Sequence, residues 1–114
     1  MNLTVPYPPS ANVYWRVARN MVYVSKEAKA YKDEVRLTNL RTKPLQGPVR
    51  LTAMVYRPRK AGDLMNREKV LCDALQGVAY VDDKQIIEAH FFLFDDKKNP
   101  RVDVTVEEVP LPLF

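Results

Sequence analysis

Alternation of apolar and polar side chains predicts most of the strands in this chain. From Val49 to Val55 every second side chain is aliphatic or Ala, which is typical of a half-buried strand over residues 49–57. The same period of two runs through residues 84–94 and residues 101–109. Because a polar segment separates these two runs, the pattern predicts that they pair as a hairpin.

The N-terminal part of the chain predicts two smaller strand elements. Residues 3–7 alternate and are followed by Pro8 and Pro9, which lack backbone donors, so a short strand must end there and lie at or near a sheet edge. The aromatic and β-branched runs 13–17 and 21–24 predict a separate hairpin.

Helical spacing appears in two places. Ser25 is a suitable N-cap for a helix from residue 26 to about residue 41, and a second helix is predicted over residues 64–76 before Gly77 ends it. The inner face of the first helix comprises Ala28, Tyr31 and Val35. The elements together predict one α+β domain over residues 1–114: a mixed sheet with both helices on one face, in the order strand, hairpin, helix, strand, helix, strand, strand.

Composition narrows the class of protein. The chain has 114 residues, of which 46% are hydrophobic, so one domain with a real core is expected. A single cysteine, Cys72, excludes an intramolecular disulfide and is more easily read as a small buried apolar residue than as a nucleophile. The sequence has neither a run of about 18 apolar residues nor a cationic leader followed by an apolar stretch. We therefore expect a cytoplasmic protein with no membrane partner.

Basic side chains are concentrated rather than spread evenly. Lys and Arg number 18 against 14 Asp and Glu, giving a net charge of +4, and residues 57–69 hold a basic cluster. Such a cluster suits a polyanion, although an ordinary solvated face would have the same composition. The candidates for contacts with DNA phosphates are Arg16, Arg19, Arg57, Arg59, Lys60 and Arg67.

Acids and a lysine could converge on one point of the second helix. Asn66, Lys69 and Asp73 share one face at helical spacing, and Asp63 stands at the start of that helix. If Asp83 folds back beside Asp63, two carboxylates and an ammonium group would surround one point. Such a set suits Mg²⁺, which prefers carboxylate oxygens and can activate water against a phosphodiester.

A purely structural interpretation of the same residues is also open. Asp63 would then be an N-cap, Asp82 and Asp83 would form a turn, and Lys69 would be a surface residue.

Three ordered blocks of sequence resemble the RusA-type Holliday-junction resolvases. The resemblance runs from about residue 3 to residue 108 in the right order. The blocks are residues 8–12 with 14–16, residues 24–28 with Tyr31, and the central motif of residues 62–69, 72–77 and 80–86.

The resemblance implies a homodimeric, magnesium-dependent endonuclease, with Mn²⁺ also possible, that cuts four-way DNA junctions by paired nicks. The first acid of the family motif falls on Asp63, its essential lysine on Lys69, and its distant acid on Asp83 with Asp82 beside it. The resemblance thus implies that Asp63, Lys69 and Asp83 are catalytic residues. It also implies that Asp63, Asp82 and Asp83 are metal ligands.

One position departs from the family pattern. Met65 stands where a second acid is usual, and a thioether is a poor ligand for a hard cation. The loss could leave a catalytically impaired protein that still binds DNA junctions, or Glu68 or Glu88 could supply the missing oxygen. A plain interaction module with incidental positive charge is a third hypothesis.

Overall fold

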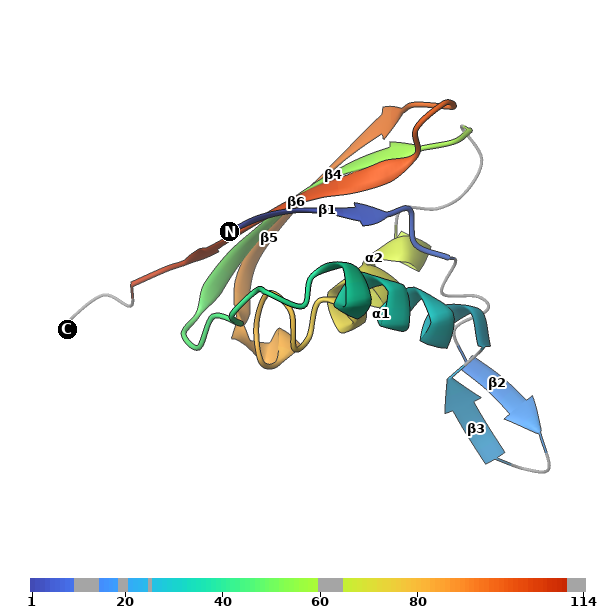
Figure 1. The fold of residues 1–114 in the computed structure, drawn as a ribbon, viewed down its shortest axis with the longest axis horizontal. Coiled ribbons are helices and arrows are strands. Elements are labelled where there is room, and N and C mark those ends of the chain that lie inside the picture. Colours follow the sequence, from blue (N-terminus) through green and yellow to red (C-terminus); the bar gives the residue numbers. More distant parts are fainter. Residues whose placement is uncertain (10–14, 19–20, 25, 60–64, 111–114) are drawn as a thin grey trace.

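A mixed sheet with both helices on one face forms the body of the protein (Figure 1). The computed structural model describes residues 1–9, 15–18, 21–24, 26–59 and 65–110, with the backbone alone for residues 15–18, 21–24, 65 and 66. The sheet has four strands in the order β1 (Asn2–Pro6), β6 (Arg101–Glu108), β4 (Val49–Arg57) and β5 (Ile86–Asp95). The helices are α1 (Lys26–Thr38) and α2 (Met65–Ala74). The predicted α+β fold and the edge position of the first strand are confirmed.

The core lies between the helices and the sheet. On β4 the alternating residues from Val49 to Val55 are buried, as the sequence pattern predicts, and the valines of β6 lie beside them. Tyr31 of α1 is also buried in this core. Its hydroxyl donates a hydrogen bond to the carbonyl of Pro6 at 2.7 Å. Burial raises the pKa of this phenol, so it remains a donor that fastens α1 to the end of β1.

The predicted pairing of the last two strands is wrong. β4 lies between them, parallel to β5 and antiparallel to β6. The polar segment after β5 is therefore a connection across β4 and not a hairpin turn. Alternation alone reveals a strand but not its neighbour, and a strand, helix, strand sequence such as β4, α2 and β5 commonly forms a parallel crossover unit.

The other predicted elements differ mainly in length. The hairpin of β2 (Trp15–Ala18) and β3 (Met21–Val24) forms as expected, while Ser25 lies outside the described residues. Both helices are shorter than predicted. Gly77 has a φ of 84° shortly after α2, a left-handed conformation that suits glycine, and its amide donates to the carbonyl of Tyr80 at 2.7 Å. No helix among the described residues is long and apolar enough to cross a bilayer.

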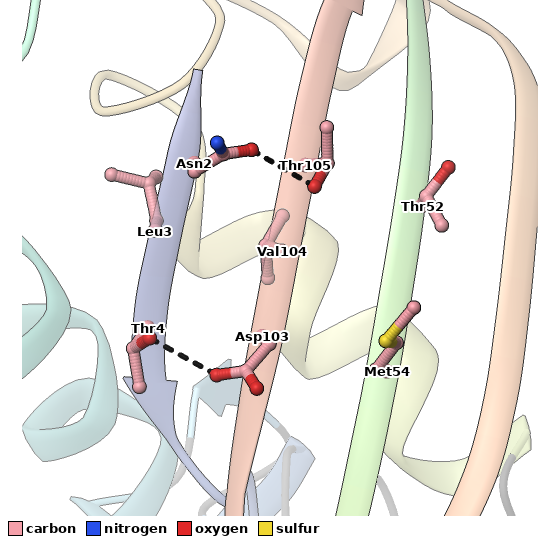
Figure 2. A pocket seen from close by; sticks show the side chains of 8 residues that line it. All are labelled: Asn2, Leu3, Thr4, Thr52, Met54, Asp103, Val104 and Thr105. Carbon is pink, nitrogen blue, oxygen red and sulfur yellow. Dashed lines mark hydrogen bonds between the residues drawn. The ribbon is translucent and has the colours of Figure 1, made fainter.

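The sheet face opposite the helices, here called the bare face, carries no covering layer among the described elements (Figure 1). Close to β1 the bare face is polar and holds a shallow cavity of about 420 Å³. Figure 2 shows two cross-strand pairs there: Thr105 donates to Asn2, and Thr4 donates to Asp103, both at 3.0 Å. Around β5 it is apolar, with Met54, Phe92 and Phe94 each more than 40% exposed.

Candidate active site

Lys69 and Asp83 line one cavity of about 350 Å³. Lys69 comes from the second turn of α2. Asp83 opens η2 (Asp83–Gln85), the short 3₁₀ turn that leads into β5. The remaining lining residues are Glu68, Cys72, Ile86 and Ala89. The structure thus brings together two of the three side chains that the resemblance implies as catalytic, and Asp63 lies outside the described residues.

Asp73 is a third charged member of this cluster. Its carboxylate is only 14% exposed and lies 3.7 Å from the Lys69 ammonium, one helical turn away. Asp73 also lies close enough to Asp83 for its negative charge to raise the pKa of the Asp83 carboxyl group. Helical spacing predicts that Asp73 shares a face with Lys69 but does not assign it to the site. The spacing of four residues between opposite charges was the signal available for including it.

The two adjacent aspartates have opposite electrostatic environments. Partial desolvation raises the pKa of Asp83, and hydrogen bonding to Asp82 and the negative charge of Asp73 raise it further. The pKa of Asp82 is lowered, mainly because its carboxylate accepts a hydrogen bond from the backbone amide of Lys84 at 2.9 Å. Asp82 thus carries its charge readily, whereas Asp83 is a crowded carboxyl group whose charge a cation would stabilise.

Gln85 holds the Asp82-Asp83 turn in place through both ends of its amide. Its oxygen accepts from the backbone amides of Val81 and Asp82, each at 2.9 Å. Its nitrogen donates to the carbonyls of Leu45 and Gly47, each at 2.8 Å. The acid pair is therefore tied to the segment that precedes β4. Sequence reasoning missed Gln85, although an aspartate followed three residues later by glutamine is a capping-box pattern.

Cys72 lines the cavity but is a structural residue and not a nucleophile. Burial raises the pKa of its thiol to about 12, so the thiolate needed for nucleophilic attack is scarce at neutral pH. Its backbone carbonyl accepts a hydrogen bond of 2.5 Å from the buried Tyr80 hydroxyl. This contact joins α2 to the loop that follows it.

The carboxylates at and beside the cavity are of the type that a hard divalent cation prefers. Glu68 and Asp83 line the cavity and Asp82 precedes Asp83 in the chain, and Mg²⁺ and Mn²⁺ both accept carboxylate oxygens. Within the described ranges no three acidic, histidine or cysteine side chains form a metal-binding group.

Glu68 and Glu88, the two residues that could replace the acid absent at position 65, lie in different places in the structure. Glu68 lines the cavity with Lys69. Glu88 lies on the bare face, where it is ion-paired to Arg50 and its carboxylate is 3.0 Å from His90. The geometry therefore favours Glu68.

The candidate phosphate contacts have different surroundings. Arg59 is exposed, whereas Arg57 is only 18% exposed and pairs with Asp95 at 2.5 Å. Arg67 donates to the carbonyl of Pro8 at 2.9 Å, and its guanidinium lies 4.9 Å from the centroid of the Tyr7 ring. Three more candidates fall outside the described side chains: Arg16, Arg19 and Lys60.

An α+β domain with carboxylates and a lysine in one cavity has the residue types that metal-assisted phosphodiester hydrolases use. The chain matches the family described as endodeoxyribonuclease RusA over residues 6–107 and belongs to that family.

Several relatives resemble the chain over nearly its whole length. It is 32% identical to the crossover junction endodeoxyribonuclease RusA of Escherichia coli K12, over 95% of this chain and 94% of the relative. The corresponding proteins of Shigella sonnei and Enterobacteria phage 82 are 31% and 30% identical over the same shares.

Asp83→Asn is expected to stabilise the metal-free protein at pH 7. Because the fold raises the pKa of Asp83, its charged form costs stability above that pKa, and the cost disappears as the pH falls and the carboxyl is protonated. Thermal melts in chelator should show a higher midpoint for Asp83→Asn at pH 7 and a smaller advantage near pH 4. Asp33→Asn, on exposed α1, is the control and should show neither effect. A less stable Asp83→Asn protein at pH 7 would contradict the electrostatic account.

Proposed function

We propose that this protein is a divalent-metal-dependent endodeoxyribonuclease that resolves four-way DNA junctions by paired nicks. The observation that carries the proposal is the meeting of Lys69 and Asp83 in one cavity, at the two positions that match the family motif. The names of the relatives, crossover junction endodeoxyribonucleases, support the choice of a branched DNA substrate.

The charged residues of the motif and of α2 have separate roles in this proposal. Asp63, Asp82 and Asp83 hold the cation, which when bound polarises the phosphodiester and activates water. Lys69 places a positive charge beside the phosphate and stabilises the negative charge that develops there. Asp73 holds the ammonium group of Lys69 from one turn away.

A catalytically impaired junction-binding protein is the alternative, because Met65 removes a possible metal ligand. The position of Glu68 in the cavity favours an active enzyme, since its carboxylate lies with Lys69 and Asp83. The two functions differ in one observable property: only the enzyme cuts DNA when metal is added.

Cleavage of a labelled four-way junction tests the function directly. We expect nicks in Mg²⁺ but not in chelator, and no cutting of a linear duplex of the same sequence. Asp63→Asn and Asp83→Asn should each abolish cleavage while junction binding stays equal or tightens, since each removes a ligand and a negative charge near phosphate. Lys69→Ala should slow cleavage with less effect on the Mg²⁺ requirement. Cleavage that persists in either aspartate variant would place the active site elsewhere.

Met65→Asp tests the departure from the family pattern. If Glu68 replaces the missing acid, Glu68→Gln should abolish cleavage in the Met65 protein and be tolerated much better when Met65→Asp is also present. Glu88→Gln, on the bare face, is the matched control and should cut normally. If Met65→Asp alone creates activity in an inactive protein, the impaired junction-binding alternative holds. Equal effects of Glu68→Gln in both backgrounds would exclude Glu68 as the replacement.

A homodimer is part of the proposal, because paired nicks need two active sites and each chain supplies one. β5 offers a surface for self-association. Among the described strands it is hydrogen-bonded on one side only, by β4. Parallel pairs are usually covered on both faces, yet Phe92 and Phe94 are 47% and 44% exposed.

We expect light scattering of the protein to give about twice the 13.2 kDa chain mass at micromolar concentration. Phe92→Ser with Phe94→Ser should shift the mass toward the monomer, because it removes apolar surface beside the free edge. Leu37→Ser with Leu40→Ser removes two exposed apolar side chains at the end of α1 and is the control. A monomeric wild-type protein that still makes paired nicks would overturn the dimer.

A further inference from the structure

We propose that the groove between α1 and α2, here called the α1–α2 groove, binds the phosphodiester backbone of DNA next to the phosphate that is cut. The inference rests on the proposed function, since it assumes that DNA occupies the neighbouring cavity. The groove contains none of the residues that the sequence predicts as phosphate contacts, which belong to residues 16–19 and 57–67.

The α1–α2 groove has a volume of about 280 Å³ and a strongly ionic lining. The α1 wall presents side chains three and four residues apart, so they share one face of that helix. The lining residues are Lys29, Lys32, Asp33 and Arg36 from α1, and Asp73, Ala74 and Gln76 from the other wall. No bulky apolar side chain lines it, so a small apolar ligand would gain little there.

Positive charge exceeds negative charge in the α1–α2 groove. Both of its carboxylates have a cationic partner: Asp33 lies 3.1 Å from Arg36, and Asp73 lies 3.7 Å from Lys69. Lys29 and Lys32 add two further cations to the same lining. Within the lining itself, three cations face two carboxylates. A polyanion is the ligand that such a lining favours.

The α1–α2 groove and the active-site cavity meet at one ion pair. Asp73 lines the groove, and its partner Lys69 lines the cavity that contains Asp83. A DNA strand whose scissile phosphate lies beside Lys69 can therefore continue into the groove.

The dimensions of the groove also suit DNA. From Lys29 to Arg36 the helix axis rises about 10 Å, at about 1.5 Å per residue, which is close to three base-pair steps of about 3.4 Å. The α1 wall can thus follow a few successive phosphates. The contacts are to the backbone, so they orient the duplex arm without reading its sequence.

The bare face does not compete for this ligand. Acids outnumber cations around its two arginines, since Arg50 contacts Glu88 and Glu107 while Arg101 contacts Asp96 and Asp103. The α1–α2 groove, where cations exceed carboxylates by one, is therefore the more favourable surface for phosphates.

A pair of double variants with equal net charge tests the inference. Lys29→Ala with Lys32→Ala removes two cations from the α1–α2 groove, and Lys97→Ala with Lys98→Ala removes two exposed cations from the connection between β5 and β6. Binding of a fluorescent four-way junction is measured by anisotropy in chelator, over a series of salt concentrations. Circular dichroism melts establish that both variants are folded.

The groove variant should bind the junction at least about tenfold more weakly at physiological salt, and its plot of log K against log salt should be shallower by about 2. The control should differ from wild type by less than about twofold, because Lys97 and Lys98 do not line the groove and are exposed to screening by salt. Equal affinities and slopes for the two double variants would overturn the α1–α2 groove as a binding surface. A wild-type protein that does not bind the junction would instead overturn the proposed function.

Discussion

The insertion of β4 between β5 and β6 is the constraint from which the arrangement of the candidate active site follows. Because β4 and β5 are parallel neighbours, the chain must cross over the sheet between them, and α2 makes that crossover. The crossover lays the Lys69 face of α2 beside the start of β5, where Asp83 stands. If β5 paired with β6 instead, the segment carrying Asp83 would enter the sheet elsewhere and these two charges would not share a cavity.

Hydrogen bonds of Gln85 then fix the position of Asp82 and Asp83 at the start of β5. An amide is the side chain that the site requires, because it accepts from the amides of Val81 and Asp82 while donating to two carbonyls before β4. A carboxylate would keep the acceptor but lose both donors, and it would add a charge beside an already crowded Asp83. The turn is thus held by neutral hydrogen bonds, and the negative charge is reserved for Asp82 and Asp83.

The sequence predicts local features well because those features have local causes. The alternation in β4 depends on side chains a few residues apart, and this prediction is confirmed, whereas α2 ends at Ala74, before the Gly77 that was expected to end it. The pairing of β5 depends on a strand some 40 positions away in the chain, and the predicted hairpin with β6 is wrong.

The same distinction applies to the site. Lys69 and Asp83 are found through a motif whose spacing is visible in the sequence. The role of Asp73 requires knowing that α2 turns that face toward Asp83. Gln85 requires knowing that the turn lies against Leu45 and Gly47, which alternation and charge do not reveal.

The distribution of charge separates the two faces of the molecule. On the bare face, acids and bases neutralise one another across strands, and the surface near β5 is left apolar. On the helix side, the α1–α2 groove has three cations and two carboxylates, and the neighbouring cavity brings Lys69 together with Glu68 and Asp83. The two faces therefore suit ligands of different chemistry: the helix side is lined by ionic side chains, whereas the bare face offers apolar surface at Phe92 and Phe94.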